Sequence, residues 1–91
     1  MERKKVTSID YLSQFLESFS KLPKKIQNKA YVKEGIFKTN PFHPILHTHK
    51  LHGKEKEVWA FWIDQKYRIK FIFLEDGVVL FLDIGTHDIY E

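Results

Sequence analysis

Histidines are the residues of this sequence best suited to chemistry. Four lie within ten residues and a fifth lies near the C-terminus: His43, His47, His49, His52 and His87. An imidazole titrates near neutral pH, so two positioned imidazoles can act as the base and the acid of one reaction. In RNA cleavage a base takes the 2′-hydroxyl proton, a cation stabilises the crowded phosphate, and an acid protonates the leaving 5′-oxygen. That chemistry would require groups such as His49, Arg68 and His87 to converge.

Two other interpretations of the histidines stay open at this point. A zinc site could use His47 with His49 or His49 with His52, but these spacings match no established ligand pattern and no carboxylate lies between them. We therefore expect no metal and no cofactor. His43, His47 and His52 can also be ordinary loop residues that do no chemistry.

The composition excludes several classes of protein. The chain has 91 residues, 43% of them hydrophobic, which is enough for one domain (residues 1–91) with one core. It has no cysteine, so it has no disulfide framework and no thiol nucleophile. It also contains no Gly-rich phosphate loop and no Gly-x-Ser-x-Gly motif. The apolar runs are far shorter than a membrane span, and no signal core follows the basic N-terminus, so we expect a cytoplasmic protein.

The charge is unevenly distributed. Residues 1–56 carry 12 Lys and Arg against 5 Asp and Glu, a net +7, whereas residues 57–91 carry 3 against 7, a net −4. A basic front of this kind suits a polyanion such as RNA, or an acidic protein segment. The alternative is a solvated helix surface, because charge favours association without identifying the partner.

Two helices are predicted before residue 41. Apolar residues recur at steps of three and four from Leu12 to Phe19, which predicts a helix over residues 8–20 with Thr7 or Ser8 as its cap. Pro23 suits the first position of a second helix, which Asn40-Pro41 ends. Residues 4–7 could add an edge strand. The two helices would form a hairpin.

Three strands are predicted after a loop that holds most of the histidines. Aromatic and β-branched runs cover residues 58–64, 67–74 and 78–84, and a short strand is possible at residues 49–51. In the middle run, alternation puts Ile69 and Phe71 on a face that packs on the helices and Arg68 and Lys70 on the other face. The predicted fold is α+β, with two N-terminal helices packed on a curved antiparallel sheet.

Aromatic residues could stack on bases, since every base offers a flat face. Core packing is the better interpretation for Trp59, Phe61 and Tyr67, because the helices need an apolar sheet face to cover. Base stacking stays open for Trp62 and Tyr90.

Four motifs, taken together and in this order, resemble the RelE/ParE toxin superfamily. The similarity spans residues 9–90 and is specific only in combination. The motifs are Asn40-Pro41-Phe42-His43-Pro44, Thr48-His49-Lys50-Leu51-x-Gly53, Trp59-x-Phe61-x-Ile63 with Tyr67-Arg68-Ile69, and Phe81-Leu82-Asp83-Ile84-Gly85-Thr86-His87-Asp88-x-Tyr90.

The resemblance implies a toxin of a type II toxin–antitoxin pair, with the RelE-like fold. Enzymes of this superfamily are usually ribosome-dependent mRNA endonucleases that cut the message without a metal, by attack of a 2′-hydroxyl on the neighbouring phosphate. The implied partners are a cognate antitoxin, the ribosome with its mRNA, and operator DNA bound through the antitoxin complex. Two alternatives are a non-catalytic toxin of the ParE type that inhibits DNA gyrase and an attenuated member that only binds its antitoxin.

The resemblance also implies roles for single residues. His49 and His87 fall where the YafQ-like branch has catalytic histidines, and either could be the base with the other as acid. Arg68 occupies the place of the arginine that RelE-type members use against the phosphate. The substrate-binding candidates are Lys50, Lys66, Lys70 and Tyr90; Lys66 or Lys70 would replace charge that RelE carries on the preceding strand, and Tyr90 would orient the substrate.

Overall fold

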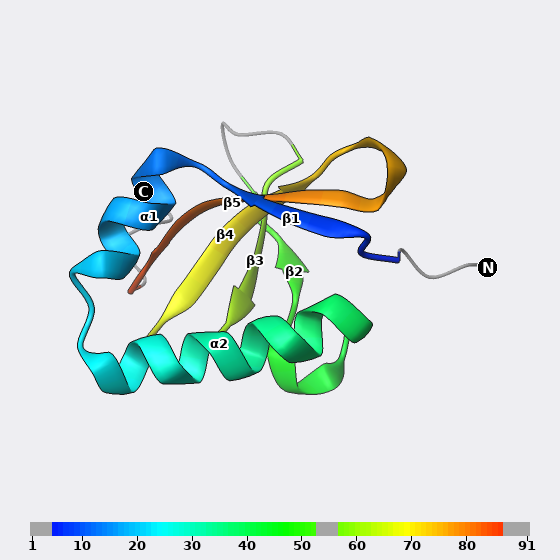
Figure 1. Cartoon of the computed structure of the whole chain (residues 1–91). Helices are drawn as coiled ribbons and strands as arrows, with labels where there is room; N and C mark the ends of the chain where they lie inside the picture. Colours follow the sequence, from blue (N-terminus) through cyan, green and yellow to red (C-terminus); the bar gives the residue numbers. More distant parts are fainter. Residues whose placement is uncertain (1–4, 53–56, 87–91) are drawn as a thin grey trace.

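A computed structural model describes residues 5–52 and 57–86 of the chain. Its strands form a five-stranded sheet in the order β1-β5-β4-β3-β2 (Figure 1). No helix in these residues is both long enough and apolar enough to cross a membrane. The elements are β1 (Ser8–Tyr11), α1 (Ser13–Ser20), α2 (Lys24–Thr39), the 3₁₀ helix η1 (Pro44–Leu46), β2 (His49–Lys50), β3 (Trp59–Trp62), β4 (Arg68–Phe73), the 3₁₀ helix η2 (Glu75–Gly77) and β5 (Val78–Gly85).

The predicted antiparallel strands are confirmed. β3 pairs with β4 and β4 with β5, and the short strand expected near residue 49 is β2, which pairs with β3 at the sheet edge. β1 adds a strand that runs parallel to β5, so the sheet as a whole is mixed. With two helices on this sheet, the α+β class is confirmed.

The helix predicted over residues 8–20 is wrong in its first half. Ser8–Tyr11 is extended and pairs with β5, and α1 begins only at Ser13, with Leu12 at its N-cap and no side-chain cap. The edge strand therefore lies four residues beyond the predicted 4–7. Hydrogen bonds from Thr7 N to Gly77 O and from Leu12 N to Phe81 O, 2.9 and 3.0 Å long, continue this backbone pairing at both ends. The unpaired edge of β5 offers partners to the extended chain, and this outweighs a helical pattern that starts at Leu12.

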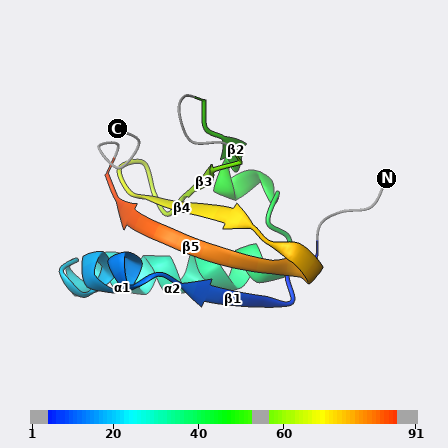
Figure 2. The same cartoon turned by 90° about the horizontal axis from the view of Figure 1, so that it is seen from above.

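The second predicted helix is confirmed as α2. It follows Pro23 and ends before Asn40, whose extended backbone leads into Pro41. Its buried residues recur at helical spacing on the stripe that faces the sheet: Ile26, Ala30 and Phe37. Phe37 is fully buried, and its ring lies 4.8 to 5.7 Å from three rings of the sheet, those of Phe61, Phe71 and Phe81. Within the described residues, both α-helices lie on the same side of the sheet (Figures 1 and 2).

A β-bulge interrupts the pairing of β4 with β5. Lys70 pairs with Asp83 and Phe71 with Phe81, which leaves Leu82 as an extra residue on β5. A bulge bends its strand and increases the local twist, in agreement with the predicted curvature of the sheet. Figure 2 shows β5 as a long curved strand beside β4.

Candidate active site

The open face is defined here as the face of the sheet turned away from the two α-helices. Ile69 and Phe71 are buried on the helix side, so the alternating residues Arg68 and Lys70 lie on the open face, as predicted. Directly paired residues of neighbouring strands share a face. Because Ala60 pairs with both Lys70 and His49, all three lie in one row on the open face.

Ala60 is the small residue in the middle of that row. Its exposed fraction is 0%, whereas His49 is exposed and Lys70 is partly exposed. Two strand spacings put the backbones of His49 and Lys70 roughly 10 Å apart. Ala60, the residue between them, carries only a methyl group. The register thus places a histidine and a lysine in one row of the open face.

The His49 ring is oriented by a backbone carbonyl. Its Nδ1 lies 2.8 Å from the carbonyl oxygen of His47. A carbonyl oxygen can only accept a hydrogen bond, so Nδ1 must carry the proton. In the neutral imidazole the lone pair is then on Nε2, which is the nitrogen that can act as a base.

Trp62 lies on the open face next to this row and contacts two other residues. The His47 ring stacks on it, with ring centroids 3.9 Å apart and an interplanar angle of 24°. Arg68, its direct partner on β4, places its guanidinium carbon 4.2 Å from the Trp62 ring centroid. The Trp62 ring is therefore already in contact with two protein groups, which argues against the open possibility that it stacks on bases.

Arg68 lies on the predicted face but is not exposed there. Only 4% of it is accessible, and its Nη1 donates to the carbonyl oxygens of Asp64 and Tyr67 at 2.6 and 3.2 Å. The expectation that Arg68 projects from the sheet is wrong because the Trp62 ring covers it. A guanidinium can donate to several acceptors in one plane while it contacts an aromatic ring. These interactions compensate for the burial of the charged Arg68 side chain.

The remaining predicted site residues lie elsewhere. Lys50 pairs with Trp59 and so faces the opposite side of the sheet from His49; its Nζ lies 3.3 Å from Oε2 of Glu57. Lys66 lies in the exposed turn between β3 and β4. His87 and Tyr90 lie outside the described residues, as do the other residues after Thr86.

The other histidines of the loop have separate local roles. His43 caps η1, because its Nδ1 accepts a hydrogen bond from the Ile45 amide at 3.1 Å. His47 ends η1 in the left-handed conformation, with φ 51°, and His52 is exposed. In residues 5–52 and 57–86, no three His, Asp or Glu side chains are grouped so that they could hold a metal ion.

Asp64 organises the turn that holds Arg68. Its Oδ1 accepts from the amides of Lys66 and Tyr67 at 2.9 and 2.8 Å, and its Oδ2 lies 3.3 Å from Lys29 Nζ. Burial acting alone would raise the pKa of Asp64, but these amides and the Lys29 ammonium outweigh burial and lower the pKa. The carboxylate therefore stays ionised and keeps the turn closed under Arg68.

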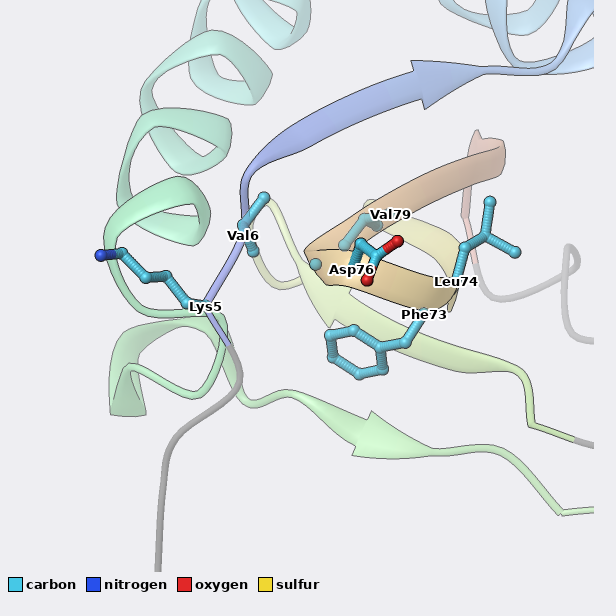
Figure 3. A pocket seen from close by; sticks show the side chains of 7 residues that line it. Lys5, Val6, Phe73, Leu74, Asp76 and Val79 are labelled. Atoms are coloured by element: carbon cyan, nitrogen blue, oxygen red, sulfur yellow. The ribbon is translucent and has the colours of Figure 1, made fainter.

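A cavity of about 200 Å³ lies away from this row, between the N-terminal segment and the turn that joins β4 to β5 (Figure 3). Its lining consists of Lys5, Val6, Phe73, Leu74, Asp76, Gly77 and Val79. None of these is a predicted site residue. The candidate site is an open sheet surface and not a closed pocket. Small molecules usually bind in pockets, so an open surface fits a polymer substrate better.

Sequence reasoning missed two contributors to the site. Ala60 carries no chemistry, and only the strand register shows that it separates His49 from Lys70. His47 was considered as a metal ligand or a loop residue, whereas the structure uses its ring against Trp62 and its carbonyl against His49. The stacking of His47 could not be read from the sequence, because the two residues are joined only through the fold.

Comparison with known proteins identifies the fold. No family model and no curated protein sequence matches the chain. Among solved structures, YafQ from E. coli strain BL21(DE3) is similar over 97% of each chain, with 21% identity and a TM-score of 0.73. A YoeB/ParE toxin from Agrobacterium tumefaciens is similar over 89% of this chain and 99% of that one, with 13% identity and a TM-score of 0.76.

An archaeal RelE–RelB complex from Pyrococcus horikoshii OT3 is also similar. It shows 16% identity and a TM-score of 0.70, over 91% of this chain and 94% of that one. The chain therefore has the fold of the RelE/ParE toxins, and the predicted RelE-like fold is confirmed.

Proposed function

We propose that this chain is the toxin of a toxin–antitoxin pair and that it cleaves mRNA on the ribosome by acid–base chemistry. The toxin fold supports the general class. The single observation that carries the chemistry is the row His49, Ala60 and Lys70, in which the strand register puts a histidine and a lysine on the same open face of the sheet, on either side of a small residue.

In the proposed reaction, His49 Nε2 takes the proton of a ribose 2′-hydroxyl. The 2′-oxygen attacks the adjacent phosphorus, the bond from phosphorus to the 5′-oxygen breaks, and a 2′,3′-cyclic phosphate forms. The acid then gives a proton to the departing 5′-oxygen, which becomes a hydroxyl. Hydrogen bonding of Nδ1 to the His47 carbonyl supports His49 as the base, because it leaves the lone pair on Nε2.

Lys70 is proposed to stabilise the negative charge that builds on the phosphate. It lies on the same face as His49, with one strand between them, whereas Arg68 is covered by Trp62. Arg68 would reach a phosphate only if it left this stack. His87 is proposed as the acid and Tyr90 as a substrate contact, on the resemblance alone; Lys66 could add charge from the neighbouring turn.

The proposed partners follow from the same class. RelE of Pyrococcus horikoshii is similar to this chain and forms a complex with RelB. A cognate antitoxin is accordingly proposed here, with operator DNA bound through the antitoxin complex. The basic first part of the chain is suited to ribosomal RNA by its charge.

Primer extension on a message in a cell-free translation reaction tests this function. The arms are the wild-type protein, the double variant His49→Ala/His87→Ala, the control variant His52→Ala and a reaction without ribosomes. We expect cuts that need ribosomes, persist in the control and vanish in the double variant.

Other results would contradict the proposal. Growth arrest without any cuts, retained by the double variant, would favour gyrase inhibition. Absence of any growth defect, with antitoxin binding intact, would favour a protein that only binds its antitoxin.

A further inference from the structure

We infer that His47 and Trp62 are positioning residues that select the tautomer and direction of the His49 ring. The side chains of Arg68, Trp62 and His47 contact one another in that order, as a stack. The contact holds His47 in place, and the backbone carbonyl of His47 accepts the hydrogen bond from His49. The inference depends on the proposed function only where it gives the tautomer a catalytic use.

The stack is anchored at Arg68. This side chain is 4% exposed and donates to two carbonyl oxygens of the turn closed by Asp64. Moving the guanidinium would leave both carbonyls without this donor in a place that water reaches poorly, which is costly. Arg68 therefore offers a fixed surface on which the Trp62 ring can rest.

Trp62 is held between two neighbours. The Arg68 guanidinium carbon lies 4.2 Å from its ring centroid and the His47 ring centroid lies 3.9 Å away. Arg68 lies on β4, His47 comes two residues before the start of β2, and these two strands flank β3 on opposite sides. The indole therefore has one neighbour from the β4 side and one from the segment that leads into β2. The indole is thus fixed, and so is the ring of His47 that lies on it.

The stack compensates for an unfavourable backbone at His47. This residue has φ 51° and ψ 39° and closes η1 through a hydrogen bond from its amide to Pro44 O. A left-handed conformation is unfavourable for a residue other than glycine, because the Cβ atom approaches the following carbonyl oxygen. Contact of the imidazole with Trp62 stabilises it and thereby fixes the direction of the His47 carbonyl.

That carbonyl decides which nitrogen of His49 carries the proton. With the oxygen of His47 2.8 Å from Nδ1, the Nδ1–H tautomer is stabilised and Nε2 holds the lone pair. If residue 47 relaxed to another backbone conformation, the carbonyl would turn away. Loss of this acceptor would shift the tautomer equilibrium of His49 toward Nε2–H, in which Nε2 is a donor.

Nuclear magnetic resonance of the full chain labelled with ¹⁵N-histidine measures this directly. The Nδ1 and Nε2 shifts of His49 report the tautomer at about pH 8.5, where imidazoles are neutral; a His49→Gln variant assigns the signals. The test variants are His47→Ala and Trp62→Ala, which remove the stack, and His47→Phe and Trp62→Phe, which keep a ring in it. His52→Ala is the control, and circular dichroism with thermal melting verifies that each variant is folded.

We expect the Nδ1–H tautomer in the wild type, the control and both phenylalanine variants, and a shift toward Nε2–H in His47→Ala. His47 is exposed, so this variant is expected to fold even where Trp62→Ala does not. Retention of the Nδ1–H tautomer in folded His47→Ala would overturn the inference, and so would an Nε2–H tautomer in the wild type.

Cleavage assays add a second readout. We expect a fall of about 10- to 100-fold in His47→Ala, because displacement of a reacting group by about 1 Å can cost that much, and recovery in His47→Phe. Equal losses in both variants would overturn the role of the stack. The tautomer is measured on the isolated protein, so absence of cleavage in the wild type would count against the proposed function and leave the tautomer result standing.

Discussion

His49 on β2 and Lys70 on β4 face the same side of the sheet, in one row and with one strand between them. This relationship follows from the register of three strands. The histidine is 21 positions from the lysine in the sequence, and the register brings them to either side of one methyl group.

Replacement of His49 by glutamine should abolish cleavage and leave stability unchanged. The side chain is exposed, so the free energy of unfolding should change by less than about 0.5 kcal/mol. Loss of a general base typically lowers a rate about 10²- to 10⁴-fold. Primer extension and thermal melting measure the two effects, with His52→Gln as the matched exposed control. A large loss of thermal stability would mean that His49 is a packing residue.

Lys70→Ala and Lys50→Ala should differ in activity. Both lysines lie on strands near His49, but only Lys70 shares its face. Removal of a charge-stabilising group commonly costs about 10²- to 10³-fold in rate, so we expect that loss for Lys70→Ala and little change for Lys50→Ala. Single-turnover cleavage of a programmed ribosome measures both. Equal rates for the two variants would exclude Lys70 from the phosphate site.

Ala60→Leu should impair cleavage by steric means. The residue has no exposed surface and lies between His49 and Lys70, so a larger side chain must push them apart. We expect a rate loss of about 10²-fold, in line with displacement of reacting groups, while Ala60→Ser stays close to wild type. Melting curves establish that both variants are folded. An Ala60→Leu protein that is folded and fully active would show that His49 and Lys70 do not act together.

Arg68→Met should destabilise the fold. The methionine preserves much of the packed stem but removes the guanidinium that donates to the Asp64 and Tyr67 carbonyls; the Tyr67 carbonyl keeps the Ile63 amide as a donor at 2.9 Å. We expect a loss of about 2–3 kcal/mol in the free energy of unfolding, measured by urea denaturation. Lys66→Met, in the exposed turn nearby, is the control and should change little. A loss below about 0.5 kcal/mol would mean that the guanidinium is not anchored at this turn.

Asp64 should make stability dependent on acid pH. Because the pKa of Asp64 is lowered in the fold relative to its ordinary 3.8, its contribution is fully present above that value and is lost as the pH falls through the folded pKa. The stability difference between wild type and Asp64→Asn should therefore be largest near neutral pH and should shrink as the pH falls below 3.8 and through the lowered pKa. Denaturation midpoints at several pH values measure it. A difference that does not depend on pH would exclude ionisation as its source.

Elements held by local patterns were predictable. The stripe of Ile26, Ala30 and Phe37 and the prolines at 23 and 41 bound α2, and the alternation from Arg68 to Phe71 placed Lys70 on the open face. The start of α1 was not predictable in this way. β1 forms because Ser8–Tyr11 pairs with the edge of β5, some 70 residues later in the sequence. Pairing between segments so far apart cannot be read from the local order of apolar and polar residues.

For the site, the sequence alone offered His49 and Lys70 as candidates by their residue type. It could not show that Arg68 is covered by Trp62, that Lys50 faces away, or that the His47 carbonyl reaches His49. Each of these depends on strand register or on side-chain stacking. Both are contacts between residues that come together only when the sheet forms. The orientation of the His49 imidazole is therefore decided by the fold and not by the composition of the histidine-rich loop.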